Sequence, residues 1–163
     1  MYEYRTKLLK ILDGDTVDVD IDLGFGIVLT DERVRIMGID TPESRTSDKV
    51  EKLFGLAAKK RLKELLGKQP VLKTQIAKDG EDMKGKFGRV LGDFSVYDAK
   101  SDSWRPVTQV MMEEGHCVDY YGGSKEEIRA KHMVNRQKLL DEGVVDRAEY
   151  DKAVVIMEKR NKS

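Results

Sequence analysis

The sequence is poor in cysteine and histidine, and it carries no excess of either charge. Cys117 is the one cysteine among 163 residues, which excludes an intrachain disulfide and a cysteine-ligated zinc site. His116 and His132 do not have the spacing of metal ligands, so we interpret both, like Cys117, as structural positions. Because 30 basic and 30 acidic residues balance to a formal charge of zero, any phosphate binding must come from local placement of Lys and Arg.

The sequence also lacks a long hydrophobic run. No apolar stretch approaches the length needed to cross a bilayer, and we expect no membrane contact. The first five residues, MYEYR, lack the hydrophobic region of a signal peptide, which favours an intracellular protein; a trimmed leader would instead indicate secretion. Apolar residues still make up 39% of the chain, which is sufficient for one small, well-solvated domain with a single core.

Hydrophobic periodicity divides the chain into a β-rich first part and a helical last part. The run over residues 16–21 alternates apolar and acidic side chains, the pattern of a half-buried strand. Such patterns predict strands over residues 4–12, 16–21, 33–39, 71–76 and 89–97. Helical spacing predicts a helix between a cap at Ser47 or Asp48 and Gly67, and further helices over 107–114, 125–140 and 147–160. We therefore expect an α+β protein, a five-stranded OB-fold β-barrel with three helices, and a fourth C-terminal helix that packs outside the core or frays.

Four short segments at predicted strand ends and turns concentrate charged side chains, and functional groups are often held on such connections. They are Asp13-Gly14-Asp15-Thr16-Val17, Arg33-Val34-Arg35, Asp40-Thr41-Pro42-Glu43 and Lys86-Phe87-Gly88-Arg89. Each segment has an ordinary explanation when it is taken alone, since an Asp-Gly pair is usually a turn and surface charges are usually solvated. Alternation also places Arg33 and Arg35 on one strand face, so it does not decide which of them contacts a ligand.

Together, in this order and at these spacings, the four segments resemble the staphylococcal nuclease (thermonuclease) family over roughly residues 8–121. The resemblance implies an OB-fold barrel, one bound Ca²⁺ ion, and hydrolysis of DNA and/or RNA to 3′-phosphate products by metal-assisted attack of water. We expect a nuclease domain over residues 1–143 and a helical extension or tail over 144–163. We also expect a monomer whose partner is its nucleic-acid substrate.

Carried over position by position, the resemblance implies that the carboxylates of Asp15 and Asp40 and the backbone carbonyl of Thr41 hold the metal. Glu43 would orient or deprotonate the attacking water, and Asp13 would lie just beyond the metal ligands. Calcium prefers oxygen ligands, and two carboxylates with one carbonyl leave room for water and for a phosphate oxygen. A bound cation would also lower the pKa of its water and neutralise a phosphate oxygen.

The resemblance also selects the side chains that would bind substrate. Arg35 and Arg89 would bind the scissile phosphate, because a guanidinium group offers two parallel donors to phosphate oxygens. At Phe87 the sequence departs from the family pattern, which has a tyrosine there, so one hydroxyl contact to phosphate is missing. Further substrate contacts are expected from the polar loop before Phe87 and from an aromatic side chain after the second predicted helix. The candidates are Lys84, Lys86, Tyr120 and Tyr121.

Two other functions stay open on the sequence alone. OB-fold barrels commonly bind single strands without cutting them, and a fold of this kind can also serve protein interaction. The neutral net charge favours the protein-interaction alternative slightly, because nucleic-acid binders usually carry a basic face. The presence of Arg35, Glu43 and Arg89 favours the enzyme.

Overall fold

Five strands close into a barrel. The computed structural model describes residues 2–67, 69–74, 89–120 and 123–162. The barrel strands are β1 (Glu3–Asp13), β2 (Thr16–Gly24), β3 (Ile27–Ile36), β5 (Val71–Thr74) and β6 (Val90–Asp98). The pairings β1–β2, β2–β3, β1–β5 and β5–β6 are antiparallel, and a parallel pairing between β3 and β6 closes the ring. The predicted α+β class and five-stranded OB-fold barrel are confirmed.

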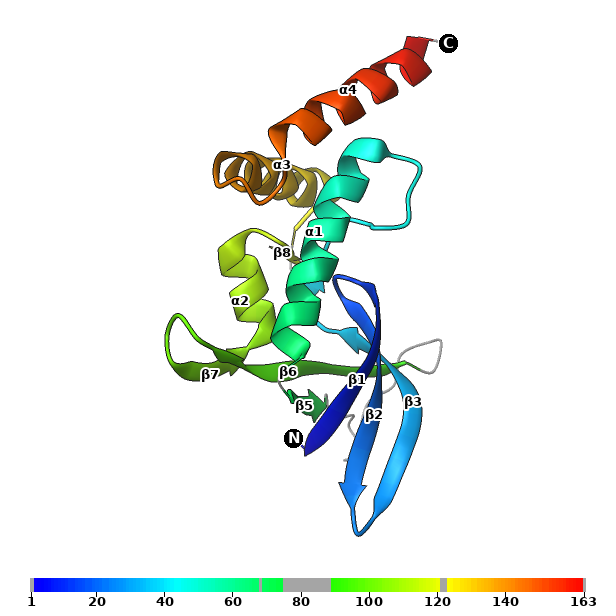
Figure 1. The fold of residues 1–163 in the computed structure, drawn as a ribbon, viewed down its shortest axis with the longest axis vertical. Coiled ribbons are helices and arrows are strands. Elements are labelled where there is room, and N and C mark those ends of the chain that lie inside the picture. The colour runs from blue at the N-terminus through cyan, green and yellow to red at the C-terminus, as the bar shows by residue number, and fades with distance from the viewer. Residues whose placement is uncertain (1, 68, 75–88, 121–122, 163) are drawn as a thin grey trace.

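Helices cover one side of the barrel and extend away from it, opposite to the projecting β2–β3 hairpin (Figure 1). The structure describes α1 (Lys49–Leu66), α2 (Val107–Glu114), α3 (Lys125–Asp141) and α4 (Arg147–Lys162). The predicted fourth helix is therefore formed, and it packs on α1: the Tyr150 ring lies edge-on to Phe54 with 6.1 Å between ring centroids. Among the described helices, none combines the length and the apolar composition needed to cross a membrane.

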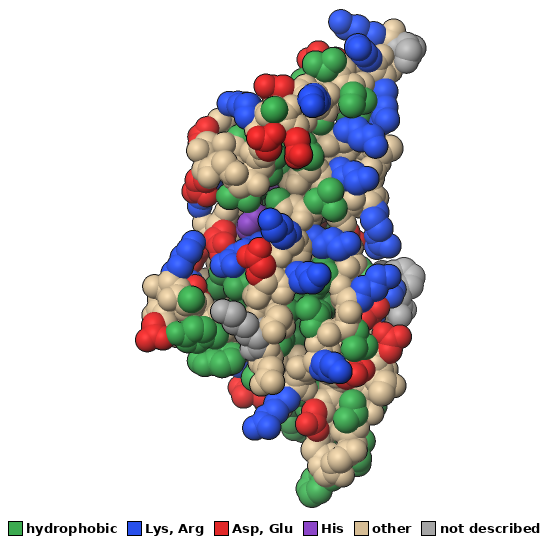
Figure 2. Space-filling view, in the orientation of Figure 1, with side chains coloured by type: hydrophobic (Ala, Val, Ile, Leu, Met, Phe, Trp, Pro, Cys, Tyr) green, Lys and Arg blue, Asp and Glu red, His purple; other side chains and the backbone are tan. Residues whose placement is uncertain are grey.

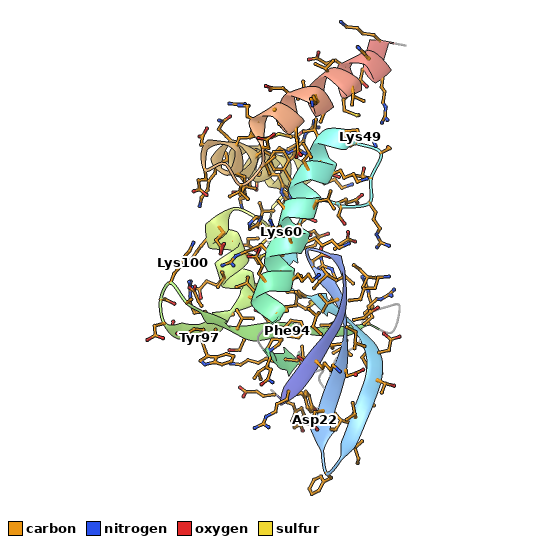
Figure 3. The ribbon with its side chains drawn as sticks, viewed as in Figure 1. Asp22, Lys49, Lys60, Phe94, Tyr97 and Lys100 are labelled. Carbon is orange, nitrogen blue, oxygen red and sulfur yellow. The ribbon has the colours of Figure 1, made fainter. Side chains whose placement is uncertain are left out.

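The barrel core is apolar and continuous with the inner face of α1. Val17 and Val19 of β2 and Val34 and Ile36 of β3 are fully buried, as the period-2 alternation predicts. Phe94 of β6 is also fully buried and lies below α1 (Figure 3). Burying one such side chain stabilises the fold by about 1.5–3 kcal/mol. This core fixes the strand ends on which the charged segments lie.

The structure differs from the predicted strand pattern on both sides of Gly38. The third strand begins at Ile27, earlier than predicted, and it ends before Gly38, whose left-handed conformation (φ 83°) turns the chain. Beyond this turn, the short strand β4 (Ile39–Asp40) leaves the barrel and pairs with β8 (Val118–Asp119). A strand that the pattern did not predict, β7 (Ser103–Pro106), extends the sheet beside β6.

Charge is distributed unevenly over the surface although it sums to zero. On the face shown in Figure 2, Lys and Arg side chains follow α1 and α4, whereas the tip of the β2–β3 hairpin ends in hydrophobic side chains. Phe25 at that tip is fully exposed. Any phosphate binding therefore depends on local clusters of Lys and Arg side chains.

Candidate active site

The turn between β1 and β2 carries the first acidic residues of the site. Asp13 and Asp15 flank Gly14, where a Cβ would stand 3.0 Å from the Cβ of Ala58 and 3.2 Å from the Cβ of Thr41. A larger residue would displace these neighbours, so glycine lets the turn pack tightly between α1 and the segment that follows β4. This packing brings the β1–β2 turn next to Thr41, in the segment that follows β4.

Three donors hold the carboxylate of Asp15. The hydroxyl of Thr16 donates to Oδ1 over 2.8 Å, and the hydroxyl of Thr41 donates to Oδ2 over 3.1 Å. The guanidinium Nη2 of Arg35 lies 3.4 Å from Oδ2. These contacts join the start of β2, the end of β3 and the segment after β4 at one side chain, and together they orient it.

Asp40 reaches the site through the pairing of β4 with β8. It pairs with Val118, and the backbone N–H of Tyr120 donates to the carbonyl of Gly38 over 3.1 Å. The Oδ2 atom of Asp40 lies 2.7 Å from Nε2 of His132 in α3. The sequence assigned His132 no role, and it carries no local signal of one, because 92 residues separate the two partners. Only the tertiary fold brings them together.

One pocket gathers the residues that the resemblance implies for metal binding and catalysis. It has a volume of about 510 Å³. Its lining residues are Asp13, Asp15, Thr16, Arg35, Asp40, Thr41, Pro42, Glu43, Arg45 and Arg89. Tyr120 is 59% exposed and is not among the described residues that line this pocket. The other expected substrate contacts, Lys84, Lys86 and Tyr121, lie outside the described residues.

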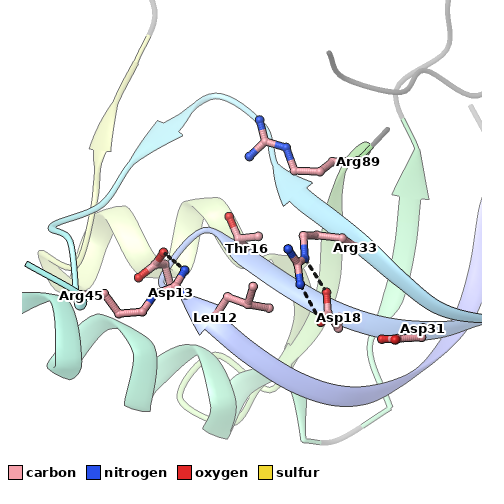
Figure 4. Close-up of a pocket in the computed structure, with 8 residues that line it drawn as sticks. All are labelled: Leu12, Asp13, Thr16, Asp18, Asp31, Arg33, Arg45 and Arg89. Atoms are coloured by element: carbon pink, nitrogen blue, oxygen red, sulfur yellow. Dashed lines mark hydrogen bonds and ion pairs between the residues drawn. The ribbon is translucent and has the colours of Figure 1, made fainter. Parts of the chain in front are cut away.

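The structure separates Arg35 from Arg33, which the alternation pattern could not do. The β2–β3 register places Asp18 opposite Arg33. Arg33 donates Nε and Nη2 to the two carboxylate oxygens of Asp18 over 2.9 and 3.3 Å (Figure 4), and this partner raises the pKa of the Arg33 guanidinium. Arg35 instead donates Nη2 to the carbonyl of Ile39 over 3.0 Å and lines the pocket beside Asp15.

A second pocket of about 450 Å³ adjoins the first (Figure 4). Its lining residues are Leu12, Asp13, Thr16, Asp18, Asp31, Arg33, Arg45 and Arg89, four of which also line the first pocket. Between the two, Nη2 of Arg45 lies 3.3 Å from Oδ2 of Asp13, and Ser44 donates to Oδ1 of the same carboxylate. Asp13 thus ties the β1–β2 turn to the residues that follow Glu43.

The donor set of the first pocket suits a hard divalent cation. Asp15 and Asp40 keep 16% and 36% of their side-chain surface exposed, so their oxygen atoms are accessible from the pocket. Across the described ranges, no group of three or more His, Cys, Asp or Glu side chains forms a metal site. A cation here would therefore need the carbonyl of Thr41 and water to complete its shell. Calcium, which takes about 6–8 oxygen ligands and accepts several waters, fits this composition.

Comparison with known proteins identifies a family model and several related sequences that match this chain. A sequence model of the family described as "Staphylococcal nuclease homologue" matches residues 33–142. The chain is 30% identical to a micrococcal nuclease of Shigella flexneri over 125 residues, which cover 74% of this chain and 62% of that protein. It is 37% identical to a thermonuclease of Staphylococcus intermedius over 82 residues, which cover 50% of this chain and 43% of that protein.

A third relative is the SPbeta prophage-derived endonuclease YokF of Bacillus subtilis (strain 168), 34% identical over 106 residues that cover 65% of this chain and 31% of that protein. The matched segments span less than two thirds of the length of these curated relatives. The closed barrel with its acidic, arginine-lined pocket is an OB-fold protein. The chain belongs to the staphylococcal nuclease family.

Proposed function

We propose that this chain is a calcium-dependent phosphodiesterase that hydrolyses DNA and/or RNA and leaves 3′-phosphate products. The observation that carries the proposal is a single pocket in which two carboxylates, Asp15 and Asp40, lie with Arg35, Glu43 and Arg89. The names of the related nucleases support the class of reaction. The choice of ion and the position of the cut rest on the family resemblance and on the donor chemistry of the pocket.

Asp15, Asp40 and the carbonyl of Thr41 would hold the ion. When it is bound, Ca²⁺ supplies positive charge that lowers the pKa of a coordinated water and neutralises a phosphate oxygen. The hydroxyls of Thr16 and Thr41 already orient the Asp15 carboxylate. Because this ligand is held before binding, less conformational entropy is lost when a cation or substrate arrives.

Glu43 would take a proton from the attacking water, since a carboxylate is ionised at neutral pH. The water oxygen forms a bond to phosphorus while the P–O5′ bond breaks, which leaves phosphate on the 3′ oxygen and a hydroxyl at the 5′ carbon. Arg35 and Arg89 would donate hydrogen bonds to phosphate oxygens as negative charge builds on them. Guanidinium groups keep their protons in proteins, so solvent water protonates the leaving oxygen.

A non-catalytic protein-interaction module is the second candidate, and the pairing of the arginines favours it. Three of the arginines at the two pockets, Arg33, Arg35 and Arg45, lie within 4 Å of an aspartate of the same chain. Such pairing leaves less free positive charge for a salt-dependent phosphate contact. The module and the enzyme differ in one respect that is easy to measure, because only the enzyme cleaves a nucleic-acid strand.

Hydrolysis of end-labelled single-stranded DNA tests the proposal. Wild type, Glu43→Ala and Arg35→Ala are each incubated with DNA in Ca²⁺ or in chelator. Arg33→Ala is the matched control, because this arginine lies on the same strand face but pairs with Asp18. The enzyme is supported if wild type and Arg33→Ala cleave the DNA in Ca²⁺ but not in chelator. Glu43→Ala and Arg35→Ala should then cleave it about a hundred- to thousand-fold more slowly in Ca²⁺. Absence of cleavage in every condition, with or without binding of the strand, supports the module.

A further inference from the structure

The helix α3 contributes a side chain to the proposed metal site although it supplies none of the implied ligands. Nε2 of His132 lies 2.7 Å from Oδ2 of Asp40, and the imidazole keeps only 15% of its side-chain surface exposed. A carboxylate that is ionised can only accept hydrogen bonds, so Nε2 must carry the hydrogen. The contact therefore fixes which oxygen of Asp40 accepts from the helix and leaves Oδ1 for another partner.

We propose that His132 is a positioning residue for Asp40, which holds Oδ2 so that Oδ1 faces the bound cation. The proposal rests on the proposed function, because it takes Asp40 as a metal ligand. Carboxylate ligands of protein-bound metals are commonly held by a hydrogen bond from a second residue, and loss of that partner weakens metal binding. Here Nε2 of the imidazole stays out of the metal shell, since it cannot donate to Asp40 and bind a cation at the same time.

The backbone that carries His132 is held firmly enough to serve this purpose. The amide of Asn135 donates to the carbonyl of Cys117 over 3.2 Å, and Nζ of Lys138 donates to the carbonyl of Glu113 over 2.5 Å. Leu139 of the same helix is 2% exposed in a cluster with Phe54 of α1. Side chains in the two turns of α3 that follow His132 thus anchor the helix to α1, to α2 and to the segment before β8.

Anchoring of α3 is the competing explanation of the contact, and the chain offers a matched control for it. Asn135→Ala removes the hydrogen bond between α3 and the carbonyl of Cys117, just before β8, but leaves the contact of His132 with Asp40 in place. If the His132 contact only anchors the helix, the two alanine variants should affect Ca²⁺ binding alike. If it orients Asp40, only the His132 variant should weaken binding. His132→Gln adds a further distinction, because its amide N–H has a reach similar to that of the imidazole Nε2–H.

Calorimetric titration of Ca²⁺ into the metal-free full chain separates these outcomes. The proposal predicts an increase in Kd of about 10- to 100-fold for His132→Ala. For His132→Gln and Asn135→Ala it predicts a Kd close to that of wild type. Circular dichroism in chelator verifies that each variant is folded, and the glutamine variant keeps the test valid if the alanine variant is not.

Equal Ca²⁺ affinity for wild type and His132→Ala would overturn the inference and leave the proposed function intact. A Kd for His132→Gln as weak as that of His132→Ala would also overturn it, because it would indicate an imidazole ligand instead of a donor to Asp40. Absence of Ca²⁺ binding by wild type would overturn the inference and the calcium-dependent function together. Cleavage of single-stranded DNA by the same protein samples reports the function separately.

Discussion

Gly55 of α1 packs directly against the backbone of Glu43. A Cβ at residue 55 would stand 2.3 Å from the carbonyl oxygen of Glu43 and 2.6 Å from the amide nitrogen of Ser44. Real Cβ atoms do not approach backbone atoms so closely. The backbone of Glu43 and Ser44 can therefore lie against α1 only because residue 55 has no side chain. The position of Glu43 in the pocket is therefore determined partly by the packing of its backbone against α1.

Gly55→Ala should displace Glu43 and slow catalysis more than it weakens metal binding. The added methyl must push the backbone of residues 43–44 away from α1, at a cost of about 1–3 kcal/mol in stability. We expect kcat for DNA hydrolysis to fall at least about tenfold, since small misplacements of a catalytic group are costly. The control is Gly123→Ala, whose Cβ would meet its nearest neighbour at 3.5 Å, an ordinary contact. An unchanged kcat for Gly55→Ala would contradict this role of the packing.

Arg35→Lys should impair hydrolysis far more than Arg33→Lys. Lysine keeps the charge but cannot offer two parallel donors to a phosphate. We expect kcat/KM to fall by about a hundred-fold for Arg35→Lys. Arg33 pairs with Asp18 in a partly exposed site, so its replacement should change kcat/KM by less than about threefold. Comparable losses in the two variants would show that the adjoining pocket also binds the reacting phosphate.

Thr41→Val should weaken Ca²⁺ binding although the backbone carbonyl of residue 41 is retained. The substitution removes the hydroxyl that donates to Oδ2 of Asp15 over 3.1 Å and keeps the shape of the side chain. We expect the calorimetric Kd to rise by about tenfold. Thr6→Val is the matched control, because it removes a buried hydroxyl donor to the carbonyl of Pro70, which lies outside the site. Equal Kd values for the two variants would contradict an orienting role of Thr41.

His116 should make the fold less stable as the pH falls. Burial lowers the pKa of its imidazole, and its Nδ1 is buried without a hydrogen-bond partner among the described residues. The folded state therefore binds this proton less tightly than the unfolded chain, whose histidine pKa is about 6.5. Stability is lost as the pH falls through about 6.5 towards the lower folded-state value.

Urea unfolding of wild type and His116→Gln at about pH 7.5 and about pH 5 measures this effect. Wild type should lose more free energy of unfolding between the two pH values than the glutamine variant, which has no proton to bind there. The comparison uses the change with pH, so a difference in absolute stability between the proteins does not affect it. Equal losses of free energy of unfolding in the two proteins would contradict the assignment of this pH dependence to His116.

The sequence predicted those features that depend on local pattern. The bounds of α2 and the Asp48 cap of α1, which accepts from the amides of Val50 and Glu51, follow from residue type and spacing along the chain. The period-2 pattern likewise identified buried Val17 and Val34, because alternation reports directly on the two faces of a strand.

Features that depend on contacts between distant segments could not be predicted in this way. The strand pair β4–β8 consists of two residues on each side and has no periodicity of its own. The contact of His132 with Asp40 requires α3 to be docked first. The difference between Arg33 and Arg35 depends on which residue of β2 lies opposite each of them, a matter of register across two strands.

An anomalous difference map from crystals grown in saturating Ca²⁺ would examine the metal site itself. We expect one calcium peak within about 2.3–2.6 Å of a carboxylate oxygen of Asp15 and of a carboxylate oxygen of Asp40. The Thr41 carbonyl should complete the protein ligands, with His132 still bonded to Asp40. A calcium peak that contacts only one of these aspartates, or neither, would contradict the shared metal site on which the proposed nuclease mechanism depends.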